Sequence, residues 1–162
     1  MDSLVAWLQA TALSKAIVLN LWIWPIAESV HFIGLTLLLG IVGFFDLRLM
    51  GFFRRVSLVG AHDLVPVAIG GFVLNLATGA IFLIGHPEQY VHNIGWWWKV
   101  GCLFVAGANA ALFEVSIGPR TMALGAGEDT SRAAKAIGLV SLVAWFGVLY
   151  FGRMLPFIGD AY

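Results

Sequence analysis

The stretch from Trp22 to Gly51 constrains the fold most, because it is a long apolar run that also carries ionisable side chains. Its length predicts a transmembrane helix, since about 20 apolar residues cross the hydrocarbon core of a bilayer. An Arg, Lys or Asp at the centre of such a helix costs at least about 2.5–3.5 kcal/mol, so each one needs a partner or a function. The ionisable residues of this stretch are Glu28, His31, Asp46 and Arg48.

Three further apolar runs follow, and the composition agrees with them. The chain has 162 residues, of which 60% are hydrophobic and 11% charged, and its mean hydropathy is +0.92. A water-soluble domain of this size cannot bury so much apolar surface, whereas a bilayer covers it. We therefore expect an all-α integral membrane protein, a four-helix bundle that forms one transmembrane domain over residues 1–162. The expected spans are about 24–49, 64–84, 94–116 and 133–155.

The segment before the first span is short and too polar to cross a membrane. Residues 3–19 show mixed helical periodicity that Gln9, Thr11 and Lys15 interrupt. This pattern predicts a short N-terminal interfacial helix. Connectors are expected at 52–63, 85–93 and 117–132, where glycine, proline and charged residues gather.

The distribution of basic residues predicts the orientation. Six lie on one side of the expected bundle: Arg48, Arg54, Arg55, Arg120, Arg132 and Lys135. Three lie on the other side: Lys15, Lys99 and Arg153. An excess of Lys and Arg marks the cytoplasmic side, so both termini and the 85–93 loop are expected outside.

Several classes of function are disfavoured. The net charge is zero, so nothing in the charge favours a nucleic-acid partner. The motifs GxSxG, GxxxxGK[ST], CxxC and HExxH are absent from the sequence. The single cysteine, Cys102, lies in an apolar run and is interpreted as a small core residue.

The candidate site lies in the outer third of the first span. Glu28 and His31 are three residues apart and share one helix face, and Gly34 follows three residues later. A histidine above a glycine leaves a flat slot for a planar group. The antiparallel neighbours bring three more polar groups to the same level, namely His86, His92 and Lys99.

Three functions fit this set. In the first, His31 is the axial ligand of haem b, Gly34 forms the slot, and Lys99 or the tryptophan-rich boundary binds the propionates. The sixth ligand is His92, His86 or absent, and the other ring nitrogen of His31 donates to Ser29, a carbonyl or Asn75. Such a protein transfers electrons or senses a redox species or small molecule, with a quinone or another redox partner.

The second function is zinc or copper binding or transport by Glu28, His31, His86 and His92. The third is a structural subunit of a membrane assembly. The simpler alternatives for single residues are a hydrogen-bonded His31, solvated loop histidines and a Glu28–Lys99 ion pair. Asp46 and Arg48 are expected to hold the cytoplasmic ends of the bundle together.

Small residues on several faces predict a homo-oligomer, either a dimer or a trimer, in the lipid bilayer. They are Gly40, Gly43, Gly101, Gly107 and Ala111.

The pattern ExxHxxG…DLRLxG, formed by Glu28–Gly34 and Asp46–Gly51, resembles a small, largely uncharacterised family of bacterial four-helix membrane proteins. The matches continue with Pro66, Thr78-Gly79, Tyr90, Asn93 and Lys99, so the likeness runs from Trp22 to Asn109. It implies a bacterial inner-membrane location.

More distantly, a first-span histidine followed by glycine is similar to four-helix b-type cytochromes and the copper-resistance D membrane family. That likeness implies a haem-dependent membrane oxidoreductase as the candidate enzyme class. Membrane cytochromes usually carry paired histidines on facing helices, whereas this chain has one clear intramembrane histidine, His31.

Overall fold

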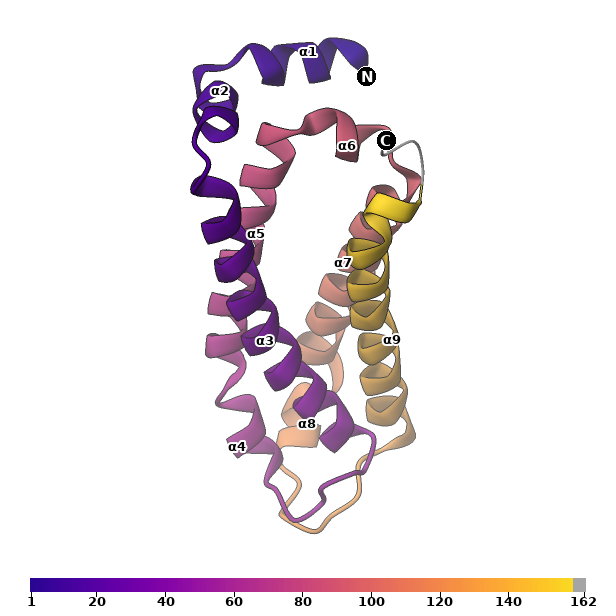
Figure 1. Cartoon of the computed structure of the whole chain (residues 1–162). Helices are drawn as coiled ribbons and strands as arrows, with labels where there is room; N and C mark the ends of the chain where they lie inside the picture. The colour runs from indigo at the N-terminus through magenta and orange to yellow at the C-terminus, as the bar shows by residue number, and fades with distance from the viewer. Residues whose placement is uncertain (159–162) are drawn as a thin grey trace.

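Four long helices dominate the computed structural model, which describes residues 1–158 (Figure 1). They are α3 (Ile23–Leu49), α5 (Val65–Gly85), α7 (Ile94–Leu112) and α9 (Arg132–Met154). With the short turns that extend them, these four are long and apolar enough to cross a membrane. The all-α, four-span prediction is therefore confirmed, with boundaries that differ by only a few residues.

The four long helices form two antiparallel pairs, α3 with α5 and α7 with α9. The pairs lie close together at one end of the bundle, where α3 contacts α9, and they separate toward the other end (Figure 1). We call the closed end the α4 end, after α4 (Leu58–His62), and the open end the α6 end, after α6 (Pro87–Val91). The end of α9 and the N-terminal helices lie at the α6 end.

The N-terminal segment forms two helices, α1 (Asp2–Ala10) and α2 (Ala12–Leu19), where one was expected. Thr11 adopts an extended conformation between them, and its hydroxyl accepts a hydrogen bond from the backbone N–H of Ser14. Threonine at this position caps the second helix and separates it from the first. The prediction of one continuous interfacial helix over residues 3–19 was therefore wrong.

The connectors contain short helical turns. The 52–63 connector carries α4, the 85–93 loop carries α6, and the 117–132 loop begins with α8 (Gly118–Met122). The third span ends in a π-helical turn, η1 (Phe113–Ile117), and a 3₁₀ turn, η2 (Leu155–Phe157), follows α9. Besides Thr11, side-chain caps start three more helices, at Ser57, Asn93 and Ser131.

Glycine allows the close contact within the first pair. A Cβ built on Gly34 of α3 would lie 2.8 Å from the carbonyl oxygen of Gly71 on α5, and 2.5 Å from Nδ2 of Asn75. A Cβ on Gly138 of α9 would lie 2.8 Å from the carbonyl oxygen of Asp46 on α3. The backbones therefore approach closely at both contacts, as small residues permit in membrane bundles.

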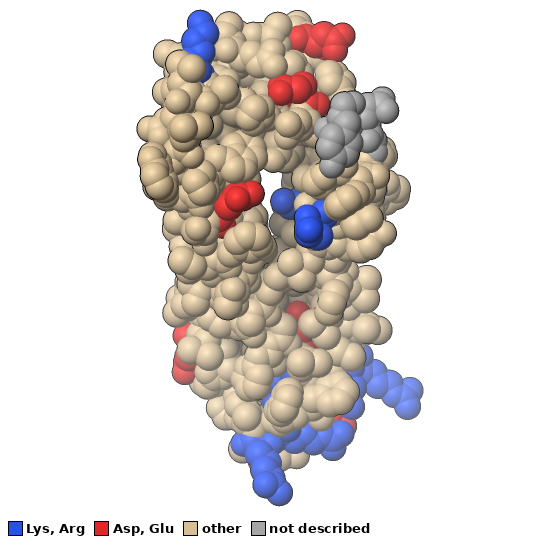
Figure 2. All heavy atoms as spheres, in the orientation of Figure 1, with Lys and Arg blue, Asp and Glu red and all other residues tan. Residues whose placement is uncertain are grey.

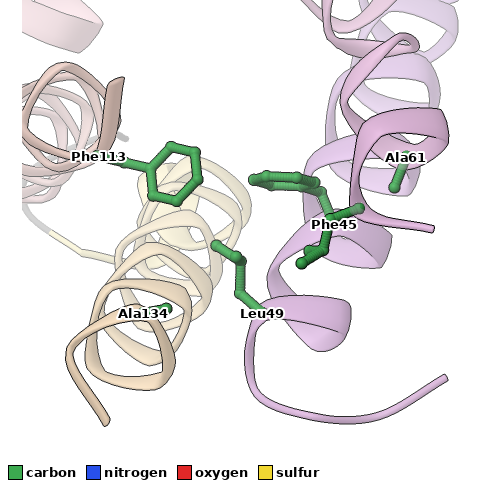
Figure 3. Close-up of a cluster of buried hydrophobic side chains, with 6 residues drawn as sticks. Phe45, Leu49, Ala61, Phe113 and Ala134 are labelled. Carbon is green, nitrogen blue, oxygen red and sulfur yellow. The ribbon is translucent and has the colours of Figure 1, made fainter. Parts of the chain in front are cut away.

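A compact cluster of buried apolar side chains lies at the α4 end, where it joins α3, α4, η1 and α9 (Figure 3). Its buried members are Phe45, Leu49, Leu58, Ala61, Phe113 and Ala134. The rings of Phe45 and Phe113 meet edge to face with centroids 5.5 Å apart. Much of the remaining apolar surface is exposed along the bundle, including Phe104 at 76% and Val115 at 82%. Such a surface suits contact with lipid chains.

Candidate functional site

His31 lies on α3, opposite α5, and its closest polar partner is Thr78. The Nδ1 atom of His31 lies 2.7 Å from Oγ1 of Thr78, and the ring is half-buried. Thr78 is itself buried, and its hydroxyl donates to the carbonyl oxygen of Leu74 at 2.7 Å. Thr78 was not predicted as this partner. Ser29 was one of the predicted acceptors, but its hydroxyl donates to the carbonyl oxygen of Pro25.

This arrangement selects one tautomer of His31. A threonine hydroxyl has a single proton, and Thr78 gives that proton to Leu74, so toward His31 it acts as acceptor. Nδ1 of His31 therefore carries the hydrogen, and Nε2 carries an unshared electron pair. Among residues 1–158 no side chain forms a hydrogen bond with Nε2. The imidazole is held in place at one nitrogen and available at the other.

Aromatic rings surround His31 on the side toward the α6 end. Its ring centroid lies 5.5 Å from that of Phe82, which lies 4.9 Å from that of Trp24. Trp24 in turn meets His86 edge to face at 5.1 Å. These contacts limit how far the His31 ring can turn.

Charged groups lie at the opening between the helix pairs. The space-filling view shows acidic atoms on the α3/α5 wall of this opening and basic atoms on the α7/α9 wall (Figure 2). Lys99 of α7 lies close enough to act electrostatically on His31, and Glu28 acts on Tyr90. Burial, with the Glu28 charge as a second cause, raises the pKa of Tyr90 to about 12. We call this opening the α6-end cleft.

Glu28 and Lys99 do not form the predicted ion pair. Among the described residues, Lys99 has no carboxylate within 4.0 Å, and Glu28 has no basic partner within that distance. The side chain of Lys99 lies against α9, where a Cβ on Gly152 would be 3.6 Å from its Nζ. The two charges therefore lie apart, Glu28 on α3 of one helix pair and Lys99 on α7 of the other.

The slot expected at Gly34 is closed. Gly71 and Asn75 of α5 occupy the space beside Gly34, so no planar group can lie against it. The sequence pattern identified a position where glycine is required, but glycine is required there because α3 and α5 are in close contact. The packing of α5 against Gly34 gives no support to its assignment to a cofactor slot.

The predicted metal site is not assembled. His92 pairs with Asp2 through Nε2 and Oδ1 at 3.1 Å, and His86 lies 3.4 Å from Glu88. Within residues 1–158, no three His, Cys, Asp or Glu side chains come together as a metal-binding group. All the predicted site residues lie toward the α6 end, but the structure does not join His31, His86 and His92.

At the α4 end, Arg48 has the structural role expected of it. It is fully buried, its Nε donates to the carbonyl oxygen of Val56 at 2.8 Å, and its Nη2 donates to that of Glu128 at 3.3 Å. One arginine thus joins the two loops that follow α3 and α8. Asp46, two residues earlier, is also buried but takes no part in these bonds.

Sequence reasoning missed two partners of the site. Thr78 contacts His31 from 47 residues away, and the only available signal was a polar residue within an apolar span. Gly152 provides the surface on which Lys99 lies. No pattern in the sequence indicated that contact.

The fold and the site define a multi-pass helical membrane protein in which a histidine of α3 contacts a threonine of α5. No protein-family model, curated protein or solved structure matches this chain. The family resemblance noted in the sequence therefore stays a prediction.

Proposed function

We propose that the protein binds haem b within the bilayer and that His31 is the axial ligand. The observation that supports this most is the Nδ1 contact of His31 with Thr78, which leaves Nε2 free. Histidines that ligate metals usually donate their other ring N–H to an acceptor, which fixes the ring and its tautomer. The site residues suit the group in this respect.

The α6-end cleft supports the same proposal. It lies between two helix pairs, and its walls carry basic atoms on one side and acidic atoms on the other (Figure 2). Lys99 of α7 lies close enough to act electrostatically on His31. A lysine without a carboxylate partner among residues 1–158 suits the propionates of haem. Lys99 and the cleft replace Gly34 in this proposal.

When bound, haem supplies reversible one-electron chemistry. The chain's own contributions are to orient the His31 imidazole through Thr78, to limit its rotation with Phe82, and to place a cation near the ligand. The protein then transfers electrons or senses a redox-active small molecule. A quinone or another redox protein is the proposed partner, and a membrane oxidoreductase is the proposed enzyme class.

The test is a reduced-minus-oxidised absorption spectrum of the protein purified in mild detergent. We expect a Soret band in the wild type and its loss in His31→Ala. His62→Ala is the matched control, because His62 lies at the α4 end beside Glu114 and is expected to leave the band unchanged. His86→Ala and His92→Ala then test whether either residue is the sixth ligand.

Two results contradict the proposal. One is a wild type without a Soret band when produced with sufficient haem, which favours a structural subunit instead. The other is a His31→Ala variant that keeps the band unchanged.

For the location, we propose a bacterial inner membrane with the α4 end in the cytoplasm. Most Lys and Arg side chains gather at that end, which supports this orientation (Figure 2). Single cysteines introduced as Glu88→Cys and Gly125→Cys in a Cys102→Ala background test it. Position 88 should react with an impermeant reagent from outside, and position 125 should not.

A further inference from the structure

Asp46 is a second buried ionisable group, and the proposed haem site does not use it. It lies three residues before the end of α3, where α3 contacts α9, and its exposed fraction is 3%. Its Oδ2 atom is fully buried and has no hydrogen-bond partner among the described residues. The side chain lies in the closed part of the bundle, at the opposite end from the α6-end cleft.

No cation compensates this carboxyl group. Within residues 1–158, no Lys, Arg or His nitrogen lies within 4.0 Å of it. The nearby charged groups are used elsewhere, and each can be named. Arg48 of α3 bonds to two loop carbonyls, Lys135 of α9 pairs with Asp129, and His62 of α4 pairs with Glu114 of η1.

Ser141 of α9, a buried and neutral side chain, lies beside Asp46. Asn109 of α7 is also buried, but its Nδ2 donates to the carbonyl oxygen of Ile137 on α9. A carboxylate removed from water without a cation costs several kcal/mol, and a buried group avoids that cost by becoming neutral. The surroundings therefore fit a neutral acid better than an ion.

We infer that Asp46 is a proton-binding site inside the membrane bundle and that it is a neutral carboxylic acid at neutral pH. A metal cation is a poorer occupant, because hard cations need about six oxygen ligands and Asp46 and Ser141 provide few. The proton removes the uncompensated charge, so the buried carboxyl group needs no cation.

Asp46 lies where the two helix pairs meet, so its proton affects the packing between them. The backbone of Asp46 is in close contact with Gly138, at the place where α3 meets α9. Loss of the proton places an unpaired negative charge at that contact. The packing between the pairs thus depends on the proton remaining bound.

The direct test is infrared spectroscopy of the full chain in lipid vesicles at neutral pH. We expect the C=O stretching band of a neutral carboxylic acid, absent in Asp46→Asn, a variant that resembles the neutral acid in shape. Glu114→Gln is the matched control, because Glu114 is exposed and paired with His62, and the band should persist in it. A wild type without the band, or an Asp46→Asn protein that keeps it unchanged, overturns the inference.

A second measurement needs no variant and decides the matter if Asp46→Asn does not fold. The chain is labelled with ¹³C at the aspartate carboxyl carbon, which shifts the acid band only if an aspartate produces it. The other described aspartates, Asp2, Asp63 and Asp129, are not buried, so among residues 1–158 a shifted band belongs to Asp46. An unshifted band assigns the acid to a glutamate and rejects the proposal.

The stability of the protein gives an independent readout. An unfolded aspartate loses its proton above about pH 4, whereas folded Asp46 would keep it at neutral pH. The folded state then binds more protons, so the free energy of unfolding falls as pH rises. We expect Asp46→Asn to show a weaker fall than the wild type. An identical pH dependence in both proteins contradicts the inference.

Discussion

The two ends of the bundle treat their polar side chains differently. At the α4 end, Arg48 is fully buried and bonded to two loop carbonyls, and the loops are joined further by Arg54 and Asp129. At the α6 end, Glu28 and Lys99 have no ion-pair partner among residues 1–158, and His31 has a free ring nitrogen. Arg48, Arg54 and Asp129 hold loops together at the first end, whereas Glu28, Lys99 and Nε2 of His31 have no such partners among residues 1–158 at the second. Variants at the α4 end should therefore change stability, and variants at the α6 end should change ligand binding.

The largest effect is expected at the α4 end, for Arg48→Met. This change leaves the carbonyl oxygens of Val56 and Glu128 without their donor. Hydrogen bonds to charged groups contribute about 1.5–3 kcal/mol each, so we expect a loss of roughly 3 kcal/mol or more. Thermal unfolding in detergent measures it, and Arg55→Met, at an exposed position, is the control. Equal stability of the two variants would remove the contrast between the ends.

The next effect tests the glycine contact between α3 and α5. Gly34→Ala forces its methyl group against Gly71 and Asn75, and overpacking of this kind costs about 1–3 kcal/mol. Gly40→Ala is the matched control, because nothing lies within 4 Å of a Cβ built there. Thermal unfolding should separate the two variants. If Gly34→Ala is as stable as Gly40→Ala, the close contact is not a constraint.

Thr78→Val tests the role of a polar side chain at the α6 end. It removes the acceptor of the His31 Nδ1–H while keeping the shape of the side chain. Loss of one hydrogen bond costs about 1 kcal/mol of stability. The proposed haem content should fall more clearly than the melting temperature, and Thr78→Ser should restore it. A Thr78→Val protein with full haem content contradicts the positioning role of Thr78.

The smallest effect is expected for Asp129→Asn, on the surface of the α4 end. The hydrogen bond from Lys135, followed by that from the Thr130 N–H and the charge of Arg54, holds the pKa of Asp129 below its usual range. The stability it contributes is present above the ordinary aspartate range and is lost as pH falls through its folded pKa. Exposed ion pairs are weak and screened by salt. Unfolding measured at low and high salt should show the difference shrinking, and a large salt-independent loss would contradict this assignment.

The sequence predicts the long-range organisation well, because each span is an uninterrupted apolar run that a bilayer selects by length. It predicts contacts between spans poorly. Gly34 was assigned to a ligand when α5 occupies its surface, and the partner of His31 proved to be Thr78. Apolar helices facing lipid show little periodicity from which to read their rotation, so the facing residues could not be identified.

The sequence also failed to predict where the N-terminal helix is interrupted. A break at Thr11 was not expected, because threonine is tolerated inside helices and also caps them. The polar character of Asp46 and Arg48 was apparent, but only the structure distinguishes them. Arg48 is bonded to two loop carbonyls, although its Nη1 has no partner, whereas Oδ2 of Asp46 has no hydrogen-bond partner among residues 1–158. Residue type alone cannot tell which buried ionisable group its surroundings bond.

α1 contacts α6, and this contact sets an order of events during synthesis. Gln9 donates to Glu88 at 2.7 Å, and these residues are 79 positions apart; His92 likewise pairs with Asp2. At about 5–20 residues per second, the ribosome needs roughly 4–16 s to produce the partners of the first helix. The first residues to be made must therefore wait at the membrane surface until two spans have inserted, and they are among the last to reach their final place.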